Sequence, residues 1–506
     1  MTDVLLEARN ISKTFVGVRA LDNVDLTIGK GEIHCLIGEN GSGKSTLIKI
    51  IGGIHKADSG TITIDGHVLS GNDAIESIRA GVQIIYQDLS LFPNLTVAEN
   101  ISINQMLETN QQLVNWKKVR ETAKRALSEI GEEIDINERV ENLSVAKKQL
   151  IAISRALTQN AKLIIMDEAT SAITNEEVKH LFSIILKLKE RGISTLFVSH
   201  KLSEVFEIAE NITILRDGKL LGVYPPQGLN EERLAYIMTG MNIKSEPYVY
   251  ASERFSETPL LEVKNLTKAG QYHDISFQIR PGEIVGMIGL IGSGRTEVVE
   301  TIFGIDRPDS GSICVNGEEV VIRNPRDAMR HGIAFLPEDR LTQGLYDVQS
   351  IGNNIVVTVI KNFLKRHKLL DLSAKNSCEH DWVKKLDIKT PTPKNPANSL
   401  SGGNQQRVVI AKWLATDPKL FILDGPTIGI DIGSKHTIHE IIRDLARQGM
   451  GIVIVSDEAQ EILDNCNRVL VMSNGKIIKE FDDSRTVESE ELLDIVARRV
   501  DAGANV

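Results

Sequence analysis

The chain repeats itself over most of its length, and this feature constrains the fold more than any other. Residues 31–33 and 58–66 recur as residues 282–284 and 309–317, at an offset of 251 residues. From the Leu-Ser pair at residue 143 onward, matching segments lie 257 residues apart. An offset that changes once by six predicts two copies of one module, with six extra residues in the second copy between about 340 and 400.

The repeat sets the expected domain boundaries. We predict one module at residues 4–243 and a second at residues 260–500. Residues 244–259 are polar and bracketed by prolines, so we interpret them as a short linker. Residues 501–506 carry no pattern and are expected to form a tail.

The composition excludes several classes of protein. The 506 residues include 58 basic and 68 acidic side chains, a net charge of -10 that disfavours nucleic acid as a partner. A membrane-spanning helix needs about 20 consecutive apolar residues, and the apolar-rich run at 284–294 ends after eleven. Acidic residues near the start argue against an export signal. The four cysteines have no ligand spacing and are expected to be reduced thiols.

A glycine-rich segment in the first copy predicts a phosphate cradle. It fits G-x-x-x-x-G-K-S, follows a strand expected at 33–37 and precedes a helix expected from Thr46. Backbone N–H groups and the helix N-terminus attract phosphate, Lys44 neutralises the β and γ oxygens, and Ser45 can ligate Mg²⁺. The alternative is a chance glycine turn. The predicted ATP-binding residues of this segment are Gly38, Glu39, Asn40, Gly41, Ser42, Gly43, Lys44, Ser45 and Thr46.

Two further strand ends of the first copy carry polar side chains. An apolar run delivers Asp167 and Glu168, which suit the Mg²⁺ hydration shell and the attacking water, respectively. In isolation such a pair could equally cap a helix or lie in a solvated loop. A second buried strand at 195–199 ends at His200, which can bond the γ-phosphate or, alternatively, act as a cap.

These residues resemble the ATP-binding-cassette family, and further markers occur in its order. The resemblance places Phe15 against adenine, Gln87 between Mg²⁺ and the membrane partner, and the signature Ser401-Gly402-Gly403 against a phosphate. It implies an α/β fold of two tandem P-loop cassettes, each with a RecA-like core and a smaller helical subdomain. The implied cofactors are ATP and Mg²⁺, the metal held by Ser45, Gln87 and Asp167, and the implied catalytic residues are Lys44, Gln87, Glu168 and His200.

The second copy has lost the residue types that hydrolysis needs. An arginine replaces the cradle lysine, and a glycine replaces the glutamate after the aspartate that both copies share. A glutamate and an aspartate stand at the positions of Gln87 and His200. We predict a degenerate second site made of Gly292, Gly294, Arg295, Thr296, Glu338, Asp424, Gly425 and Asp457.

The signature shows the opposite asymmetry. The first copy has valine and alanine where the second keeps Gly402 and Gly403 after Ser401, and Asp431 matches Thr174 of the first copy. In the resembled family two modules pair head to tail, so that each ATP lies between one P-loop and the other signature. The resemblance therefore implies one hydrolytic site, to which Asp431 also belongs, and one impaired site.

Within this family the chain is similar to the fused double-ATPase subunits of bacterial monosaccharide importers. The shared marks are residues 292–297, 336–340, 400–406 and 429–431. The chain departs from that group at Gly425, Ala169 and Ile428, where glutamate, proline and arginine are usual.

The same similarity implies the partners and the location of the protein. It implies a separate permease, in two copies, and a sugar-binding protein that acts through it. The chain would lie on the cytoplasmic face of the inner membrane and contact the membrane only through the permease. Residues 88–100 and 339–353 are the expected permease-contacting segments.

Two other functions remain as alternatives. A soluble twin-cassette ATPase acting on ribosomes or nucleic acid usually has a basic linker, whereas this linker is short and the chain is acidic. A nucleotide-gated structural protein without turnover is disfavoured by the intact first site.

Overall fold

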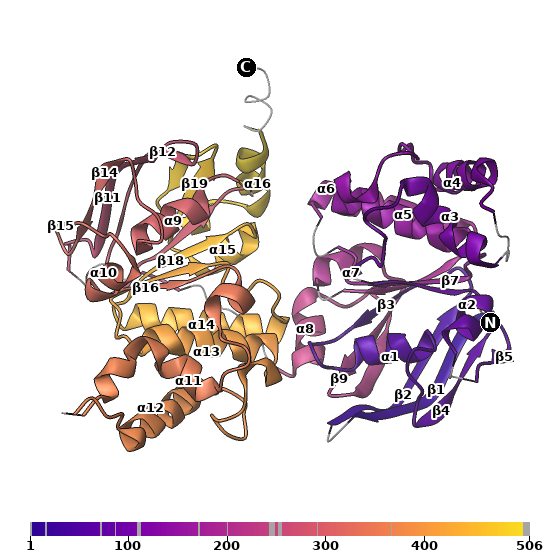
Figure 1. Cartoon of the computed structure of the whole chain (residues 1–506), viewed down its shortest axis with the longest axis horizontal. Coiled ribbons are helices and arrows are strands. Elements are labelled where there is room, and N and C mark those ends of the chain that lie inside the picture. Colours follow the sequence, from indigo (N-terminus) through magenta and orange to yellow (C-terminus); the bar gives the residue numbers. More distant parts are fainter. Residues whose placement is uncertain are drawn as a thin grey trace. The chain divides into compact units, whose positions relative to one another are not determined.

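The computed structural model describes residues 3–15, 18–70, 73–86, 88–108, 113–170, 173–199, 201–241, 248–250, 253, 256–290, 292–365 and 367–498. The chain divides into two compact units, Met1–Ile243 and Lys244–Val506. Figure 1 colours the first unit indigo to magenta and the second pink through orange to yellow.

Two β-sheets form the frame of the first unit. Its strands are β1 (Val4–Phe15), β2 (Val18–Gly29), β3 (Ile33–Ile37), β4 (Ser59–Ile64), β5 (His67–Val68), β6 (Val82–Ile85), β7 (Leu163–Asp167), β8 (Ser194–Val198), β9 (Asn211–Arg216) and β10 (Lys219–Tyr224). The antiparallel sheet has the order β2-β1-β4-β5, and the larger sheet has the order β10-β9-β3-β8-β7-β6. In the larger sheet only β10 pairs antiparallel. Strands β3, β7 and β8 are almost wholly buried because parallel strands are covered on both faces.

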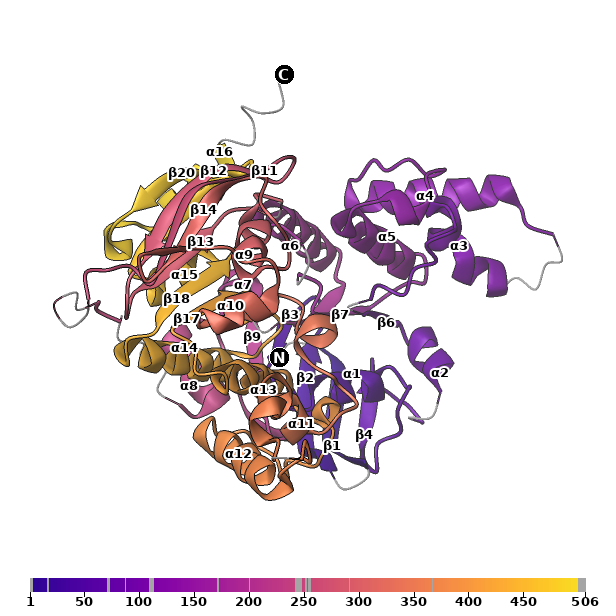
Figure 2. The same cartoon turned by 60° about the vertical axis from the view of Figure 1, so that its left-hand side comes forward.

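The helices of the first unit fall into two groups. They are α1 (Lys44–Ile51), α2 (Ala74–Arg79), α3 (Val97–Glu108), α4 (Trp116–Ile130), α5 (Val145–Leu157), α6 (Asn175–Glu190), α7 (Leu202–Ile208) and α8 (Glu231–Thr239). Leu47 and Ile51 of α1 pack in a core that both sheets share. Helices α3, α4 and α5 form a separate core around Ile101, Ala123 and Ile151, and Figure 2 shows them as a group. This group is the smaller helical part that the sequence predicts.

The second unit repeats this frame strand for strand. Its strands are β11 (Leu261–Lys268), β12 (Tyr272–Ile279), β13 (Ile284–Ile288), β14 (Ser310–Val315), β15 (Glu318–Val320), β16 (Ile333–Leu336), β17 (Leu420–Asp424), β18 (Gly451–Ser456), β19 (Arg468–Ser473) and β20 (Lys476–Phe481). Their orders are β12-β11-β14-β15 and β16-β17-β18-β13-β19-β20. The predicted repeat and the α/β fold class are therefore confirmed.

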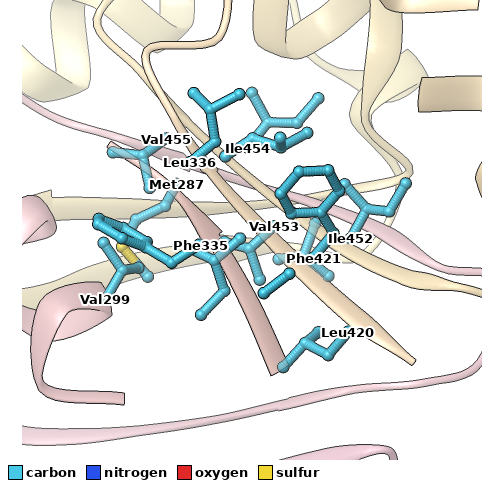
Figure 3. Close-up of a cluster of buried hydrophobic side chains, with 14 of the residues drawn as sticks. Met287, Val299, Phe335, Leu336, Leu420, Phe421, Ile452, Val453, Ile454 and Val455 are labelled. Atoms are coloured by element: carbon cyan, nitrogen blue, oxygen red, sulfur yellow. The ribbon is translucent and has the colours of Figure 1, made fainter. Parts of the chain in front are cut away.

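The helices of the second unit surround a large apolar core. They are α9 (Arg295–Phe303), α10 (Pro325–Arg330), α11 (Ile351–Val356), α12 (Leu372–Lys385), α13 (Gly402–Leu414), α14 (Ile432–Arg447), α15 (Ala459–Asn465) and α16 (Ser489–Arg498). Figure 3 shows Met287, Phe335, Phe421 and Val453 from four neighbouring strands packed in this core. Among the helices of the described residues, none has the length and apolarity that crossing a membrane requires.

The six extra residues of the second copy lie in two places, both within the range of about 340 to 400 that the sequence predicts. Asn100 hydrogen-bonds both backbone groups of Phe92, and Asn354 does the same for Tyr346 at an offset of 254. Three residues are therefore inserted before Tyr346, where a π-helical turn covers Arg340–Gly344, and three more follow Asn354. The sequence alone does not show this division, because the loops on either side share few identical residues.

Candidate functional site

The first unit forms a phosphate cradle between β3 and α1. Lys44 is buried, and its Nζ donates to the carbonyl oxygens of Gly38 at 2.7 Å and Glu39 at 3.0 Å. Gly43 precedes the helix with a φ of 105°, and a Cβ added there would lie 2.6 Å from the Ala20 oxygen. A side chain at residue 43 is therefore excluded both by the backbone conformation and by close contact. The two hydrogen bonds keep the Lys44 ammonium group inside the loop, where it can contact a bound phosphate.

The hydroxyl groups of the cradle differ in their access to solvent. Ser45 is exposed at the first turn of α1 and Thr46 is half-buried. Asn40 and Gly41 are also exposed, on the rim of the loop. Ser42 is buried, and its Oγ has no hydrogen-bond partner among the described residues. The exposed hydroxyl of Ser45 is the one that a hydrated cation can reach.

The acidic pair lies at the end of β7, at the same edge of the sheet as the cradle. Burial and the neighbouring Glu168 raise the pKa of the Asp167 carboxyl, while Lys44 and Lys49 oppose this shift. Glu168 has a φ of 51°, and its N–H donates to the Val198 oxygen of β8 at 3.0 Å. The structure thus brings Lys44, Asp167 and Glu168 together, as carboxyl ends of parallel strands require.

Three other predicted residues of the first site have different outcomes. Phe15 is 41% exposed at the end of β1, with its ring centroid 5.4 Å from that of His55. The ring is not part of the core and can therefore stack on a planar ligand. Gln87 and His200 lie outside the described residues, so both remain predictions.

The corresponding cradle of the second unit has an arginine in place of the lysine, and its aspartate is buried. Arg295 follows Gly294, whose φ is 94°, and its guanidinium donates to the Ser456 oxygen at the end of β18. The side chain of Thr296 hydrogen-bonds Asp424, which is 3% exposed. Burial raises the pKa of the Asp424 carboxyl to about 7. Glycine 292 stays exposed on the rim of the loop.

Gly425 reproduces the backbone of Glu168 without its side chain. Its φ is 56°, and its N–H donates to the Val455 oxygen at 2.9 Å. Glu338 and Asp457 are both exposed near this strand end. The second unit therefore has no carboxylate at the position that orients water in the first.

The signature glycines of the second unit are in close contact with neighbouring elements. Ser401 precedes α13, and a Cβ on Gly402 would lie 3.2 Å from Nη2 of Arg340. A Cβ on Gly403 would lie 2.3 Å from the Cβ of Ser434 on α14. Asp431 caps α14 by accepting from the Ser434 N–H at 2.9 Å, as Thr174 caps α6. Asp431 thus has a structural role in addition to the ATP contact that the sequence predicts.

We expect Gly403→Ala to destabilise the second unit by about 1–3 kcal/mol, because the new methyl group overlaps Ser434. Ser434→Gly removes the clashing atoms, so the double variant should recover most of the loss. Urea unfolding of the single and double variants measures both effects. Equal stability of Gly403→Ala and the unsubstituted protein would contradict the close packing of α13 on α14.

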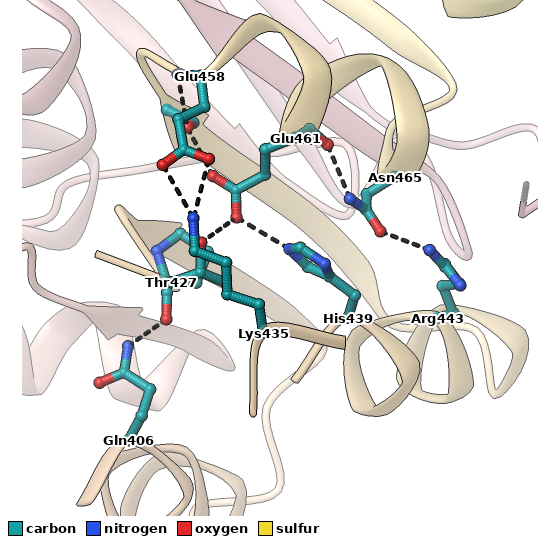
Figure 4. A network of polar contacts seen from close by, with 10 residues as sticks. Gln406, Thr427, Lys435, His439, Arg443, Glu458, Glu461 and Asn465 are labelled. Atoms are coloured by element: carbon teal, nitrogen blue, oxygen red, sulfur yellow. Dashed lines mark hydrogen bonds and ion pairs between the residues drawn. The ribbon is translucent and has the colours of Figure 1, made fainter. Parts of the chain in front are cut away.

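A buried glutamate that was not predicted from the sequence lies beside each candidate site. Glu461 accepts hydrogen bonds from Thr427 and Ser456, both at 2.6 Å, and pairs with His439 at 2.9 Å (Figure 4). Although burial acts to raise the pKa of Glu461, the bonds from His439, Ser456 and Thr427 lower it to about 2. Glu204 accepts from the matching Thr170 and Ser199 of the first unit.

A buried glutamine joins each signature helix to the loop after the acidic position. Gln149 donates to the Ala169 oxygen in the first unit, and Gln406 donates to the Pro426 oxygen in the second at 2.7 Å. Both glutamines, like the two buried glutamates, are identical at an offset of 257. Because these glutamines and glutamates are identical in the two copies, a comparison of the copies could have identified them.

The fold and the cradle define a tandem P-loop nucleotide-binding protein, and comparison with known proteins gives its family. The ABC transporter family matches residues 21–171 and 272–428. The chain therefore belongs to the ABC transporter family, and it is an ATPase coupled to transport.

Curated relatives cover nearly the whole chain. The Ribose import ATP-binding protein RbsA of Caldanaerobacter subterraneus subsp. tengcongensis is 39% identical, over 97% of this chain and 99% of its own length. A putative ribose/galactose/methyl galactoside import ATP-binding protein of Geobacillus kaustophilus is 41% identical, over 95% of each chain. The Galactose/methyl galactoside import ATP-binding protein MglA of Salmonella typhimurium is 39% identical, over 97% of each. The resemblance described from the sequence is confirmed.

A solved structure of a single cassette also matches the chain. The ATP-binding cassette of an ABC transporter in its ADP conformation has 27% identity and a TM-score of 0.42. The match covers 47% of this chain and 95% of that one.

Proposed function

We propose that the chain energises import of a monosaccharide or a related small sugar through a separate membrane permease. The observation that carries this proposal is the similarity, over 94–97% of this chain, to proteins named for ribose and galactose import. Two permease copies and a sugar-binding protein would complete the importer. The chain would act as a peripheral protein on the cytoplasmic face of the inner membrane. Its two modules would be residues 4–243 and 260–500, with a linker at 244–259 and a tail at 501–506.

Hydrolysis is assigned to the first cradle. Lys44 binds the terminal phosphates, and Glu168 accepts the proton of the attacking water, since the two side chains lie at one edge of the sheet. Exposed Ser45 and half-buried Asp167 fit Mg²⁺, which neutralises phosphate charge when bound. Gln87 and His200 complete the proposed site, and Phe15 stacks on adenine.

The second cradle is proposed to be impaired. Gly425 provides no base, and Glu338 and Asp457 place negative charge where the first unit has Gln87 and His200. The signature residues Ser401, Gly402 and Gly403 remain intact in this unit, together with Asp431.

The function is tested by reconstitution with its own partners. We expect the chain to co-purify from membranes with a multi-helix permease and to drive ATP-dependent uptake of a radiolabelled monosaccharide into vesicles. Uptake should require the sugar-binding protein. Association only with ribosomes, without a membrane partner, would contradict the proposal.

A further inference from the structure

The loop of the second cradle keeps the backbone that binds phosphate. Helix α9 has nine residues, and the preceding Gly292 and Gly294 have φ values of 82° and 94°. Ser293 between them is 5% exposed, and its Oγ has no hydrogen-bond partner among the described residues. A buried hydroxyl without a partner is costly unless a ligand satisfies it. The N–H groups of the helix start and this hydroxyl together point to a bound phosphate group.

The residues that would hold Mg²⁺ do not fit a hydrated cation in this unit. Thr296 hydrogen-bonds Asp424, and Asp424 is 3% exposed. Their counterparts in the first unit are exposed Ser45 and half-buried Asp167. Because Mg²⁺ usually keeps several of its waters, it needs ligands that are open to solvent.

Arg295 supplies the positive charge that a metal would bring. Its guanidinium donates to the Ser456 oxygen, and it is within electrostatic range of Asp457, Asp424 and Glu338. A guanidinium also binds phosphate oxygens through two parallel N–H donors.

Several carboxylates act electrostatically on Arg295 in the second cradle. Four positions that carry no acid in the first unit carry one here: Glu297, Glu300, Glu338 and Asp457. Glu300 stands where the first unit has Lys49, so a favourable charge is reversed. This field opposes the extra negative charge of a γ-phosphate more than it opposes a diphosphate.

We propose that the second cradle binds a nucleoside diphosphate without a divalent cation, with Arg295 as its built-in cation. Ser293 and the N–H groups of α9 bind the terminal phosphate. Asn10 and Asn265 share a positive φ at an offset of 255, and at this offset Gly270 stands where the first unit has Phe15. Gly270 provides no ring, so the phosphates supply most of the recognition. This inference rests on the proposed function, since it gives the impaired cradle a ligand.

The test measures binding of radiolabelled ADP to the full chain by equilibrium dialysis in EDTA. Lys44→Ala weakens the first cradle, and we expect this variant to retain one ADP per chain without Mg²⁺. Adding Arg295→Ala should weaken that binding about tenfold or more, because a charge-assisted contact to phosphate is lost. Ser293→Ala should weaken it several-fold, whereas Ser373→Ala, at an exposed position of the second unit, should leave it unchanged. Circular dichroism melting checks that each variant is folded.

Three results would overturn the proposal. These are no ADP binding by Lys44→Ala in EDTA, binding that requires Mg²⁺, or equal affinity in the Arg295→Ala double variant. The proposed function is tested separately, by measuring Mg²⁺-dependent ATP turnover of the unsubstituted chain. Loss of that turnover would refute the hydrolytic assignment and not the diphosphate site.

Discussion

Glu168→Gln is expected to lower steady-state ATP turnover about 10²–10⁴-fold, because the substitution removes the general base. The side chain follows the end of β7 and lies beside Asp167. ATP affinity should stay within a few-fold, since Lys44 and the loop that bind phosphate are untouched. Phosphate release and labelled-ATP binding, measured on the same preparation, separate the two effects.

The matched control for Glu168→Gln is Glu190→Gln. Glu190 is an exposed residue at the end of α6, so its substitution should leave turnover unchanged. If Glu168→Gln hydrolyses ATP at a near-normal rate, hydrolysis does not depend on the first cradle and the one-site account fails.

Glu461→Ala should destabilise the second unit by about 3–5 kcal/mol, because it leaves His439, Ser456 and Thr427 without their buried acceptor. Unfolding in urea can be followed by Trp382 and Trp413 in a Trp116→Phe background, which confines the tryptophan signal to this unit. Glu458→Gln is the control, since its exposed pair with Lys435 should contribute at most about 1 kcal/mol.

The Glu461 carboxyl also predicts a pH dependence. Its pKa is lowered from 4.5 to about 2 in the folded protein, so its contribution to stability is complete above pH 4.5. The contribution is lost as the pH falls from 4.5 through 2. In Glu461→Ala this part of the acid destabilisation should be absent. An identical acid profile in both proteins would contradict the network.

Much of the fold followed from the repeat. Equal spacing of the repeated segments predicted two copies of one module, and both units do share one sheet order. The range of the inserted residues was predicted, but their division into two places was not. Asn354 accepts a hydrogen bond from Tyr346 just as Asn100 does from Phe92. Only the structure reveals this match, because the residues around the two asparagines differ.

The sequence predicted the site residues that follow strands, but it did not predict the buried glutamate on a helix. Lys44, Asp167 and Glu168 follow apolar runs, so parallel strands bring them to one edge. Glu461 lies on a helix, where a glutamate usually indicates an exposed face. Its burial depends on partners from α14 and the loop after β17, which sequence spacing does not place together.

Vanadate trapping with labelled 8-azido-ATP and Mg²⁺ tests most directly whether hydrolysis is confined to the first cradle. Vanadate retains ADP only after turnover, and a protease site engineered into residues 244–259 separates the two units after photolabelling. The account predicts vanadate-dependent label in the first unit alone. Equal vanadate-dependent label in both units would contradict it.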